Sequence, residues 1–393
     1  MRQTPQLDAD LILCHVLSVS RTWLFLHNDD VLSPEQETAF DLALKKRLGG
    51  LPVAYIIGEK EFYGRTFFVT QDVLIPKPDT ELLVEKAVAY AKASLSAGRD
   101  SGAGRVCEAD VGSEAGRGAN SGRQFRFADI CTGSGCIAIS VLAELAGDVF
   151  AHIHADATDI SEAALAVARK NAESLLGGAA VPGGVRGDSC LGAGQPCLGA
   201  ASGAIQFFQG DLCSPLMAAG ADDKVGEFGE CEAGACGARA AKSTFNQTKY
   251  DMVLSNPPYV PAAVTDELLK DGRGEPRLAL DGDTDSALAG ELTRGGKALA
   301  TGGESGDAAQ VGTARAESRG FQAASRETGD GLAIIRRLIP QVKEILLPGG
   351  VFFMETGEYN AEKAAEYLSK CGFTDIVIHR DLAGQLRLVE SHL

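Results

Sequence analysis

The tetrapeptide Asn256-Pro257-Pro258-Tyr259 is the part of the sequence whose residue types point most directly to chemistry. It follows a strand-like apolar run at 251–254, and two consecutive prolines must end that strand because neither has an N–H to donate. Each proline also holds the residue before it in an extended conformation. The sequence therefore predicts an amide side chain, rigid carbonyls and an aromatic ring at the tip of a strand.

Such a corner is suited to gripping a planar –NH2 group, as in a carboxamide or an aminopurine. The lone pair of that nitrogen is delocalised, which makes it a poor nucleophile. The Asn256 side-chain oxygen and the Pro257 carbonyl can accept its two N–H bonds and stabilise the positive charge that develops on nitrogen. Tyr259 can stack on the planar group. A bare Asn-Pro-Pro turn can equally be structural, so the prediction depends on its surroundings.

A glycine-rich turn at 129–138, with the sequence DICTGSGCIA, joins a predicted strand to a predicted helix. Gly133 and Gly135 let the backbone turn tightly, and the start of the helix offers free N–H groups to a ligand. Alone, this pattern is as compatible with a plain turn as with a cofactor site.

Acidic residues at the next two strand ends favour a cofactor. Asp159 can accept both hydroxyls of an adenosine ribose, and Asp211 can reach an adenine amino group. Because the carboxyl ends of parallel strands meet at one sheet edge, we expect these residues to lie together. A nicotinamide dinucleotide and S-adenosylmethionine both fit so far. The corner at the fourth strand end favours S-adenosylmethionine, whose sulfonium the ring of Tyr259 can face.

The elements that position these motifs alternate between strand and helix patterns. The predicted strands occupy residues 125–130, 150–160, 204–212, 251–254, 350–356, 374–380 and 386–391. Helical patterns separate the first ones, which predicts an α/β fold with a parallel, doubly wound sheet. Before it, helical spacing over 1–50 and two short strands around Gly64 predict a small helical domain with a hairpin linker at 1–75. The α/β domain then occupies 76–393.

Four segments rich in Gly, Ala and Ser interrupt the α/β pattern, at 97–123, 177–203, 218–247 and 286–328. They hold few apolar side chains to offset the entropy cost of ordering. We therefore expect low-complexity loop insertions, disordered and exposed to solvent.

Composition limits the classes of partner. The formal net charge of −16 disfavours direct nucleic-acid binding, because phosphate neutralisation calls for a basic face. The ten cysteines include no CxxC pair, so reduced thiols and no metal site are expected. The N-terminus lacks a basic leader and no apolar run is long enough to span a membrane, which favours the cytoplasm.

Taken together, these motifs resemble the peptide-chain release factor N5-glutamine methyltransferases, a class I S-adenosylmethionine-dependent family. The likeness is carried by residues 52–85 and by the runs DICTGSGCIAIS, ATDIS, QGDL, NPPYV and EPRLALDGDTDS. It implies a seven-stranded class I methyltransferase sheet and methylation of the glutamine in the Gly-Gly-Gln motif of class 1 release factors. It also implies that the helical N-terminal domain binds the release factor.

The resemblance also implies a role for each matching position. The cofactor loop comprises Cys131, Thr132, Gly133, Ser134 and Gly135; Asp159 binds the ribose, Asp211 and Leu212 flank the adenine, and Asn256 borders the cofactor. The glutamine amide is held by Asn256, Pro257, Pro258 and Tyr259. Asn256, Pro257 and Tyr259 are also the implied catalytic residues, whereas Pro258 only binds the substrate. Family members usually have glycine where Cys131 stands. If that position has a positive φ, cysteine there costs about 1 kcal/mol.

Two other functions stay open. N6-adenine methylation of DNA or RNA uses the same tetrapeptide on the same fold, because the two amines are geometrically alike. The acidic charge and the lack of a basic, aromatic-interleaved segment disfavour it. An adenosyl-binding module without activity is the other alternative, and the insertions and Cys131 are compatible with it.

Overall fold

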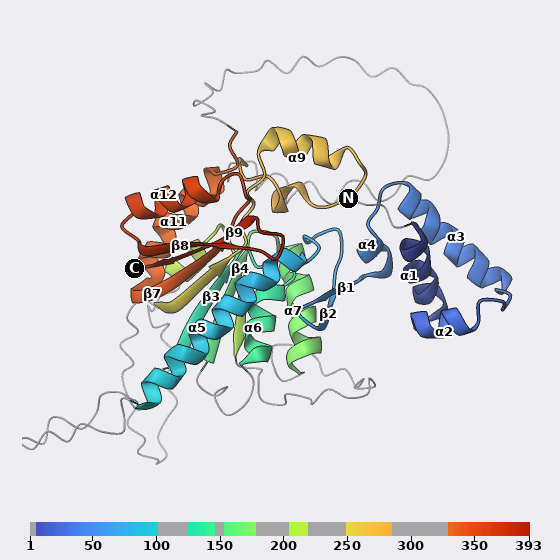
Figure 1. Ribbon diagram of the computed structural model, residues 1–393, viewed down its shortest axis with the longest axis horizontal. Coiled ribbons are helices and arrows are strands. Elements are labelled where there is room, and N and C mark those ends of the chain that lie inside the picture. Colours follow the sequence, from blue (N-terminus) through green and yellow to red (C-terminus); the bar gives the residue numbers. More distant parts are fainter. Residues whose placement is uncertain (1–4, 101–123, 146–152, 178–203, 219–248, 285–328) are drawn as a thin grey trace, which may run out of the picture.

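The N-terminal helices stand apart from the sheet (Figure 1). The computed structural model describes residues 5–100, 124–145, 153–177, 204–218, 249–284 and 329–393. Its first helices are α1 (Pro5–Leu17), α2 (Arg21–Leu26), α3 (Pro34–Leu48) and α4 (Val53–Ile57). Helix α3 begins at a capping box, in which Ser33 Oγ accepts from Gln36 N and Gln36 Oε1 accepts from Ser33 N. The expected helical start of the chain is confirmed, and α1 packs on α3 and α4.

A hairpin links these helices to the α/β part of the chain. Strands β1 (Glu59–Phe62) and β2 (Arg65–Phe68) pair antiparallel around Gly64, as predicted. Asn171 in α7 (Glu162–Leu176) anchors the hairpin, because its side chain bonds both the N–H and the carbonyl of Phe68. The same amide donates to the carbonyl of Ser134 at 2.9 Å. A short helix η1 (Pro78–Thr80) then leads into α5 (Glu81–Asp100).

The main sheet has seven strands in the order β5-β4-β3-β6-β7-β9-β8. Their bounds are β3 (Phe125–Ile130), β4 (Ile153–Asp159), β5 (Ile205–Gln209), β6 (Tyr250–Ser255), β7 (Leu346–Glu355), β8 (Thr374–Arg380) and β9 (Leu386–His392). Strands β3 to β7 are parallel, whereas β9 runs antiparallel to both neighbours. The expected sheet is confirmed except for this reversal. Only five residues join β8 to β9, and so short a connection makes a hairpin rather than a parallel crossover.

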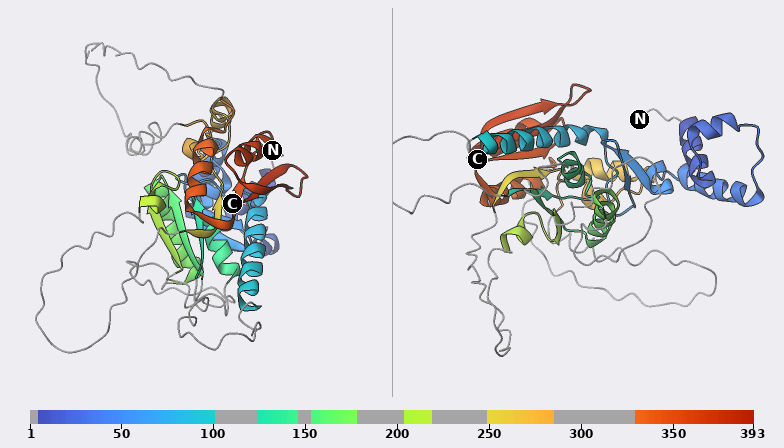
Figure 2. Two further views of the ribbon diagram at one scale, coloured as in Figure 1. Left: turned by 90° about the vertical axis from the view of Figure 1, so that its left-hand side faces the viewer. Right: turned by 90° about the horizontal axis from the view of Figure 1, so that it is seen from below.

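Helices cover both faces of the sheet (Figure 2). On one face α5, α6 (Cys136–Glu144) and α7 pack against Phe127 and Phe353. On the other, α8 (Ser214–Ala218), α11 (Ala333–Ile345) and α12 (Ala361–Lys370) pack against Ala128 and Phe352. Neighbouring residues of one strand serve opposite faces, as strand geometry requires. The sheet is therefore doubly wound and buried on both sides.

Several elements were not expected from the sequence. Helix α9 (Ala262–Leu269) and the turn η4 (Arg277–Ala279) follow β6 and lie over the edge of the sheet. The four Gly/Ala-rich segments fall almost wholly outside the described residues, so the prediction made for them stays a prediction. Among the helices that the structure describes, none is long and apolar enough to cross a membrane.

Candidate active site

One cavity lies where the carboxyl ends of β3, β4, β5 and β6 meet. Parallel pairing aligns Ile130 with Thr158 and with Ser255, so the segments that follow these strands start from one edge. Nine of the predicted site residues line this cavity: Cys131, Thr132, Gly133, Ser134, Asp159, Asp211, Leu212, Asn256 and Pro258. Gly135, Pro257 and Tyr259 do not line it. The fold thus gathers most of the predicted set at one place.

The loop between β3 and α6 depends on positive backbone angles. Gly133 has φ 55° and Gly135 has φ 79°. A Cβ at Gly135 would come within 2.8 Å of Ile139 Cδ1 and 3.2 Å of Ala168 Cβ, and it would have to adopt a positive φ, so this position between α6 and α7 favours glycine. A Cβ at Gly133 would meet nothing within 4 Å. Cys131 has φ 63°, a conformation that side chains other than glycine rarely adopt.

Two carboxylates, the buried Asp129 and the partly exposed Asp159, hold this loop. Asp159 accepts from the N–H of Gly133 through Oδ2 and from the N–H of Ser161 through Oδ1, each at 2.9 Å. Asp129 Oδ2 accepts from the Thr132 hydroxyl at 2.7 Å and from the N–H of Ala138. Burial raises the pKa of Asp159, and it raises the pKa of Asp129 to about 7. These hydrogen bonds therefore hold the loop to the ends of β3 and β4.

The end of the cavity at β5 contains a charged residue that the sequence did not reveal. Arg337 of α11 lines the cavity and forms an ion pair with Asp211. Leu212 has φ 53°, and its carbonyl accepts from the Thr158 hydroxyl at 2.9 Å. Arg337 belongs to a helix more than a hundred residues beyond β5 in the chain, so the sequence did not connect it with Asp211. The only sequence signal was a charged residue within an otherwise apolar helical pattern.

The Asn256 side chain has a defined orientation. Its Nδ2 donates to Oγ1 of Thr80 at 3.3 Å, which leaves Oδ1 as an acceptor. Thr80 is buried in η1 and also lines the cavity. The preceding Ser255 donates to the carbonyl of Ile130, which ties the end of β6 to β3. Thr80 has no motif of its own, so sequence reasoning missed it.

Tyr259 is anchored to the neighbouring strand. Its hydroxyl donates to Glu355 Oε1 at 3.2 Å, at the end of β7. Its carbonyl accepts from the Tyr359 hydroxyl and from Asn360 Nδ2. Burial and the Glu355 carboxylate raise the pKa of Tyr259 far above neutrality, so the phenol stays protonated. The predicted stacking of this ring on a substrate stays a prediction.

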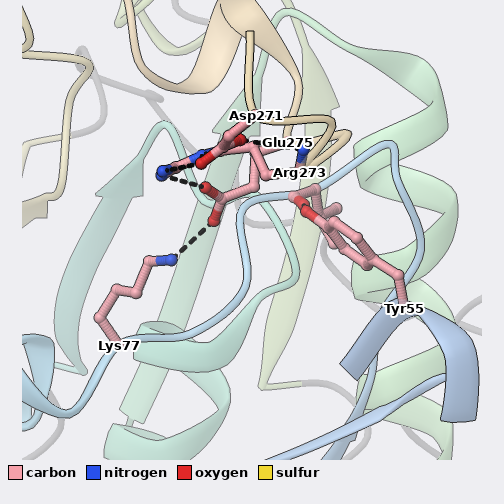
Figure 3. Close-up of polar contacts among 6 residues, drawn as sticks. Tyr55, Lys77, Asp271, Arg273 and Glu275 are labelled. Atoms are coloured by element: carbon pink, nitrogen blue, oxygen red, sulfur yellow. Dashed lines mark hydrogen bonds and ion pairs between the residues drawn. The ribbon is translucent and has the colours of Figure 1, made fainter. Parts of the chain in front are cut away.

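The opposite wall is formed by residues near 72–77 and 276–279. Figure 3 shows the charged cluster behind it. Glu275 is buried and accepts from Lys77 Nζ at 2.6 Å, while Arg273 pairs with both Glu275 and Asp271. Beside it, the Tyr55 hydroxyl donates to the carbonyl of Val73 at 2.6 Å. Glu275 begins the EPRLAL run, and its ion pair with Lys77 holds this run against the segment that precedes α5, while Pro276, Leu278 and Ala279 of the run line the cavity.

The residues present fit an adenosine-containing ligand. The backbone of the loop borders open space at Gly133, and Asp159 retains lone pairs for a diol. Apolar side chains offer a surface for a flat base: Ile75, Ile160, Leu212, Leu278 and Ile334. No group of three or more metal-ligating side chains occurs in the described part of the chain.

Comparisons with known proteins agree with this architecture. Residues 2–58 match the family model described as the PrmC N-terminal domain. The release factor glutamine methyltransferase of Bordetella pertussis is 30% identical over 389 residues, covering 99% of this chain and 95% of the relative. That of Coxiella burnetii is 27% identical over 98% of this chain and 91% of its own length. The release factor glutamine methyltransferase of Chlorobaculum tepidum is 33% identical over 277 residues, which cover 70% of this chain and 68% of the relative.

The sheet order and the glycine loop, together with these relatives, define a class I methyltransferase. Within that class, the chain belongs to the release factor glutamine methyltransferase family. The resemblance inferred from the sequence is thereby confirmed.

Proposed function

We propose that this enzyme transfers a methyl group from S-adenosylmethionine to the side-chain amide nitrogen of the glutamine in the Gly-Gly-Gln motif of class 1 release factors. The observation that supports this most is Asn256, which lines the same cavity as Asp159 and the Gly133 loop. The names of the relatives support the substrate, because they specify glutamine and a release factor.

The cofactor, when bound, supplies a methyl group on a positively charged sulfur. In this proposal the loop from Cys131 to Gly135 and Asp159 hold the ribose end, and Asp211 and Leu212 flank the adenine. Thr80 keeps the Asn256 oxygen free to accept one N–H of the glutamine amide. The Pro257 carbonyl accepts the other, and the adjoining Pro258 keeps that carbonyl rigid. Tyr259 covers the planar amide. Both acceptors would strengthen as the S–CH3 bond breaks, the N–CH3 bond forms and positive charge grows on nitrogen, and the methylated nitrogen would then lose one proton to water.

The N-terminal region at 1–75 is the proposed contact for the release factor body, and the expected compartment is the cytoplasm. Helix α2 supports this partner surface, since Phe25 is 78% and Leu26 is 70% exposed. Large apolar side chains this exposed in neighbouring positions often mark protein contacts.

Mass spectrometry of a release factor peptide tests the proposal. The purified enzyme is incubated with S-adenosylmethionine and a class 1 release factor, and a parallel reaction contains duplex DNA. One added methyl group on the Gly-Gly-Gln glutamine is the expected product. Methyl transfer to DNA alone would overturn the proposal in favour of adenine methylation.

A further inference from the structure

An ion pair at the β5 end of the cavity contains one residue that has no part in the chemistry above. Arg337 of α11 lines the cavity together with its partner Asp211. Their side chains are 33% and 35% exposed, so a ligand in the cavity can reach both charges. Ion pairs that retain this much contact with solvent contribute little to stability, which makes stability alone a weak reason for the pair.

The chain segment that carries the carboxylate is held in place by other contacts. The N–H of Cys213 donates to Oε1 of Gln341 at 3.0 Å, and Gln341 lies one turn beyond Arg337 on α11. The carbonyl of Leu212 accepts from the Thr158 hydroxyl, as described above. These two contacts fix the backbone, whereas the bond from Arg337 reaches only the carboxylate side chain.

The bond from Arg337 distinguishes the two oxygens of Asp211. Nη2 of the arginine donates to Oδ2 of the aspartate. Among the hydrogen bonds within the described residues, none reaches Oδ1. A carboxylate oxygen can only accept and a guanidinium can only donate, so the bond has one possible direction. Oδ1 is therefore the atom left for a ligand, and it requires a donor.

The surroundings of this oxygen suit the edge of a flat base. Leu212 follows the aspartate, Ile334 precedes Arg337 by one turn of α11, and both apolar side chains line the cavity. A base that lies against them can direct its exocyclic group to Asp211 Oδ1. The exocyclic amine of adenine donates to a carboxylate oxygen, whereas the carbonyl that replaces it in hypoxanthine is repelled.

We propose that Arg337 is a positioning residue for the cofactor, which holds the Asp211 carboxylate toward the base and so makes the site specific for adenine. A carboxylate released from the arginine can turn away from the amine, or turn toward the N1–H that hypoxanthine carries beside its carbonyl. This inference rests on the proposed function, because that function places adenine beside Asp211 and Leu212.

The experiment measures two dissociation constants by calorimetry. The first is for S-adenosylhomocysteine, and the second is for S-inosylhomocysteine, in which a carbonyl replaces the adenine amine. Their ratio measures discrimination between the two bases. The variants are R337M, D211N and the double variant D211N/R337M, and the urea unfolding midpoint of each shows whether it folds.

Two controls separate positioning of the carboxylate from general support of the pocket. R336M is the matched arginine control, since Arg336 pairs with Asp330 and does not line this cavity. Q341L removes the acceptor for the N–H of Cys213 without touching the carboxylate. Q341L can therefore weaken both ligands equally, but it should leave their ratio unchanged.

We expect the unaltered protein to bind S-adenosylhomocysteine about 100-fold more tightly than S-inosylhomocysteine. In R337M the Kd for S-adenosylhomocysteine should rise about tenfold, and the ratio should fall to about tenfold. R336M should match the unaltered protein in both constants.

D211N tests the orientation while Arg337 stays in place. The arginine can bond only the oxygen of the new amide, so the NH2 group is left for the base and can donate to the hypoxanthine carbonyl. D211N should therefore prefer S-inosylhomocysteine. In D211N/R337M nothing selects the orientation of the amide, and the ratio should approach one. This pair of variants tests the inference even if R337M alone does not fold.

An unchanged ratio in a folded R337M, or a D211N that keeps the preference of the unaltered protein, would overturn the inference. A fall in the ratio of Q341L equal to that of R337M would also overturn it, because Arg337 would then only hold the segment. If the unaltered protein binds S-adenosylhomocysteine, methylates a release factor and loses no discrimination in R337M, the inference fails alone. If the unaltered protein does not bind S-adenosylhomocysteine, the proposed function fails together with the inference.

Discussion

Lys77 Nζ lies 2.6 Å from Oε1 of Glu275 and joins two segments that are 198 residues apart in the chain. Lys77 precedes α5, and Glu275 lies in the loop between α9 and η4. The carboxylate is buried while the lysine is partly exposed. This pair therefore joins the two segments, near 72–77 and 276–279, that form one wall of the cavity.

Removing the lysine should destabilise the fold. K77A leaves the buried Glu275 carboxylate with only the longer contact to Arg273, so the free energy of unfolding should fall by about 2 kcal/mol. K270A is the control, because Lys270 and Glu267 form a pair exposed to solvent. Its effect should stay below about 0.5 kcal/mol in urea unfolding. Equal effects would show that the buried pair contributes no more than a surface pair.

Replacing Cys131 by glycine should stabilise the protein. Its φ of 63° is strained for a side chain, so C131G should raise the free energy of unfolding by about 0.5–1 kcal/mol. C371G is the control, because Cys371 has an ordinary φ of −81°. This change should lower the free energy of unfolding, since glycine only adds flexibility to the unfolded chain. Urea unfolding of both variants measures the difference. A loss of stability in C131G would mean that packing of the thiol outweighs the strain.

Asn256 is expected to matter for the rate. N256A removes the proposed acceptor for the glutamine amide, so kcat should fall about 100-fold in the release factor assay. V264A, at an exposed position on the nearby helix α9, should leave kcat unchanged. An N256A enzyme with the unaltered kcat would exclude the proposed clamp.

Asp129 should make stability depend on pH. Its folded pKa of about 7 lies above the value near 4 expected for an unfolded chain, so the folded state binds the proton more tightly. Its contribution to stability is present below about pH 4 and is lost as the pH rises to about 7. D129N, which cannot ionise, should therefore lose less stability than the unaltered protein between pH 5 and 8. The difference should be on the order of 1–2 kcal/mol by urea unfolding at each pH. If the free energies of unfolding of D129N and the unaltered protein changed with pH in parallel, the raised pKa assigned to Asp129 would be contradicted.

The exposed side chains of α2 should influence substrate binding without affecting chemistry. F25D should raise the KM for the release factor about tenfold and leave kcat and the unfolding midpoint unchanged, because Phe25 is 78% exposed. L382D is the matched control, as Leu382 is a fully exposed apolar residue in the β8–β9 turn. A similar KM for F25D and the unaltered enzyme would place the docking surface elsewhere.

The sequence predicted the sheet because its strands are apolar runs separated by helical patterns. The direction of β9 could also have been inferred, since the five residues after Arg380 are too few for a crossover. Most of the predicted site residues meet because strand ends of a parallel sheet share an edge. Thr80, Arg337 and Glu355 could not be found in this way, because their contacts join elements far apart in the chain and depend on tertiary packing.

The side chain of Asn171 bonds at once to the hairpin at Phe68 and to the glycine loop at Ser134. The hairpin follows α4 directly, so Asn171 ties the chain that leaves the N-terminal helices to the loop that is proposed to hold the methyl donor. If the proposed function is correct, a single carboxamide links the part of the chain that docks the protein substrate to the loop that holds the methyl donor, and a release factor that docks poorly would then be methylated slowly.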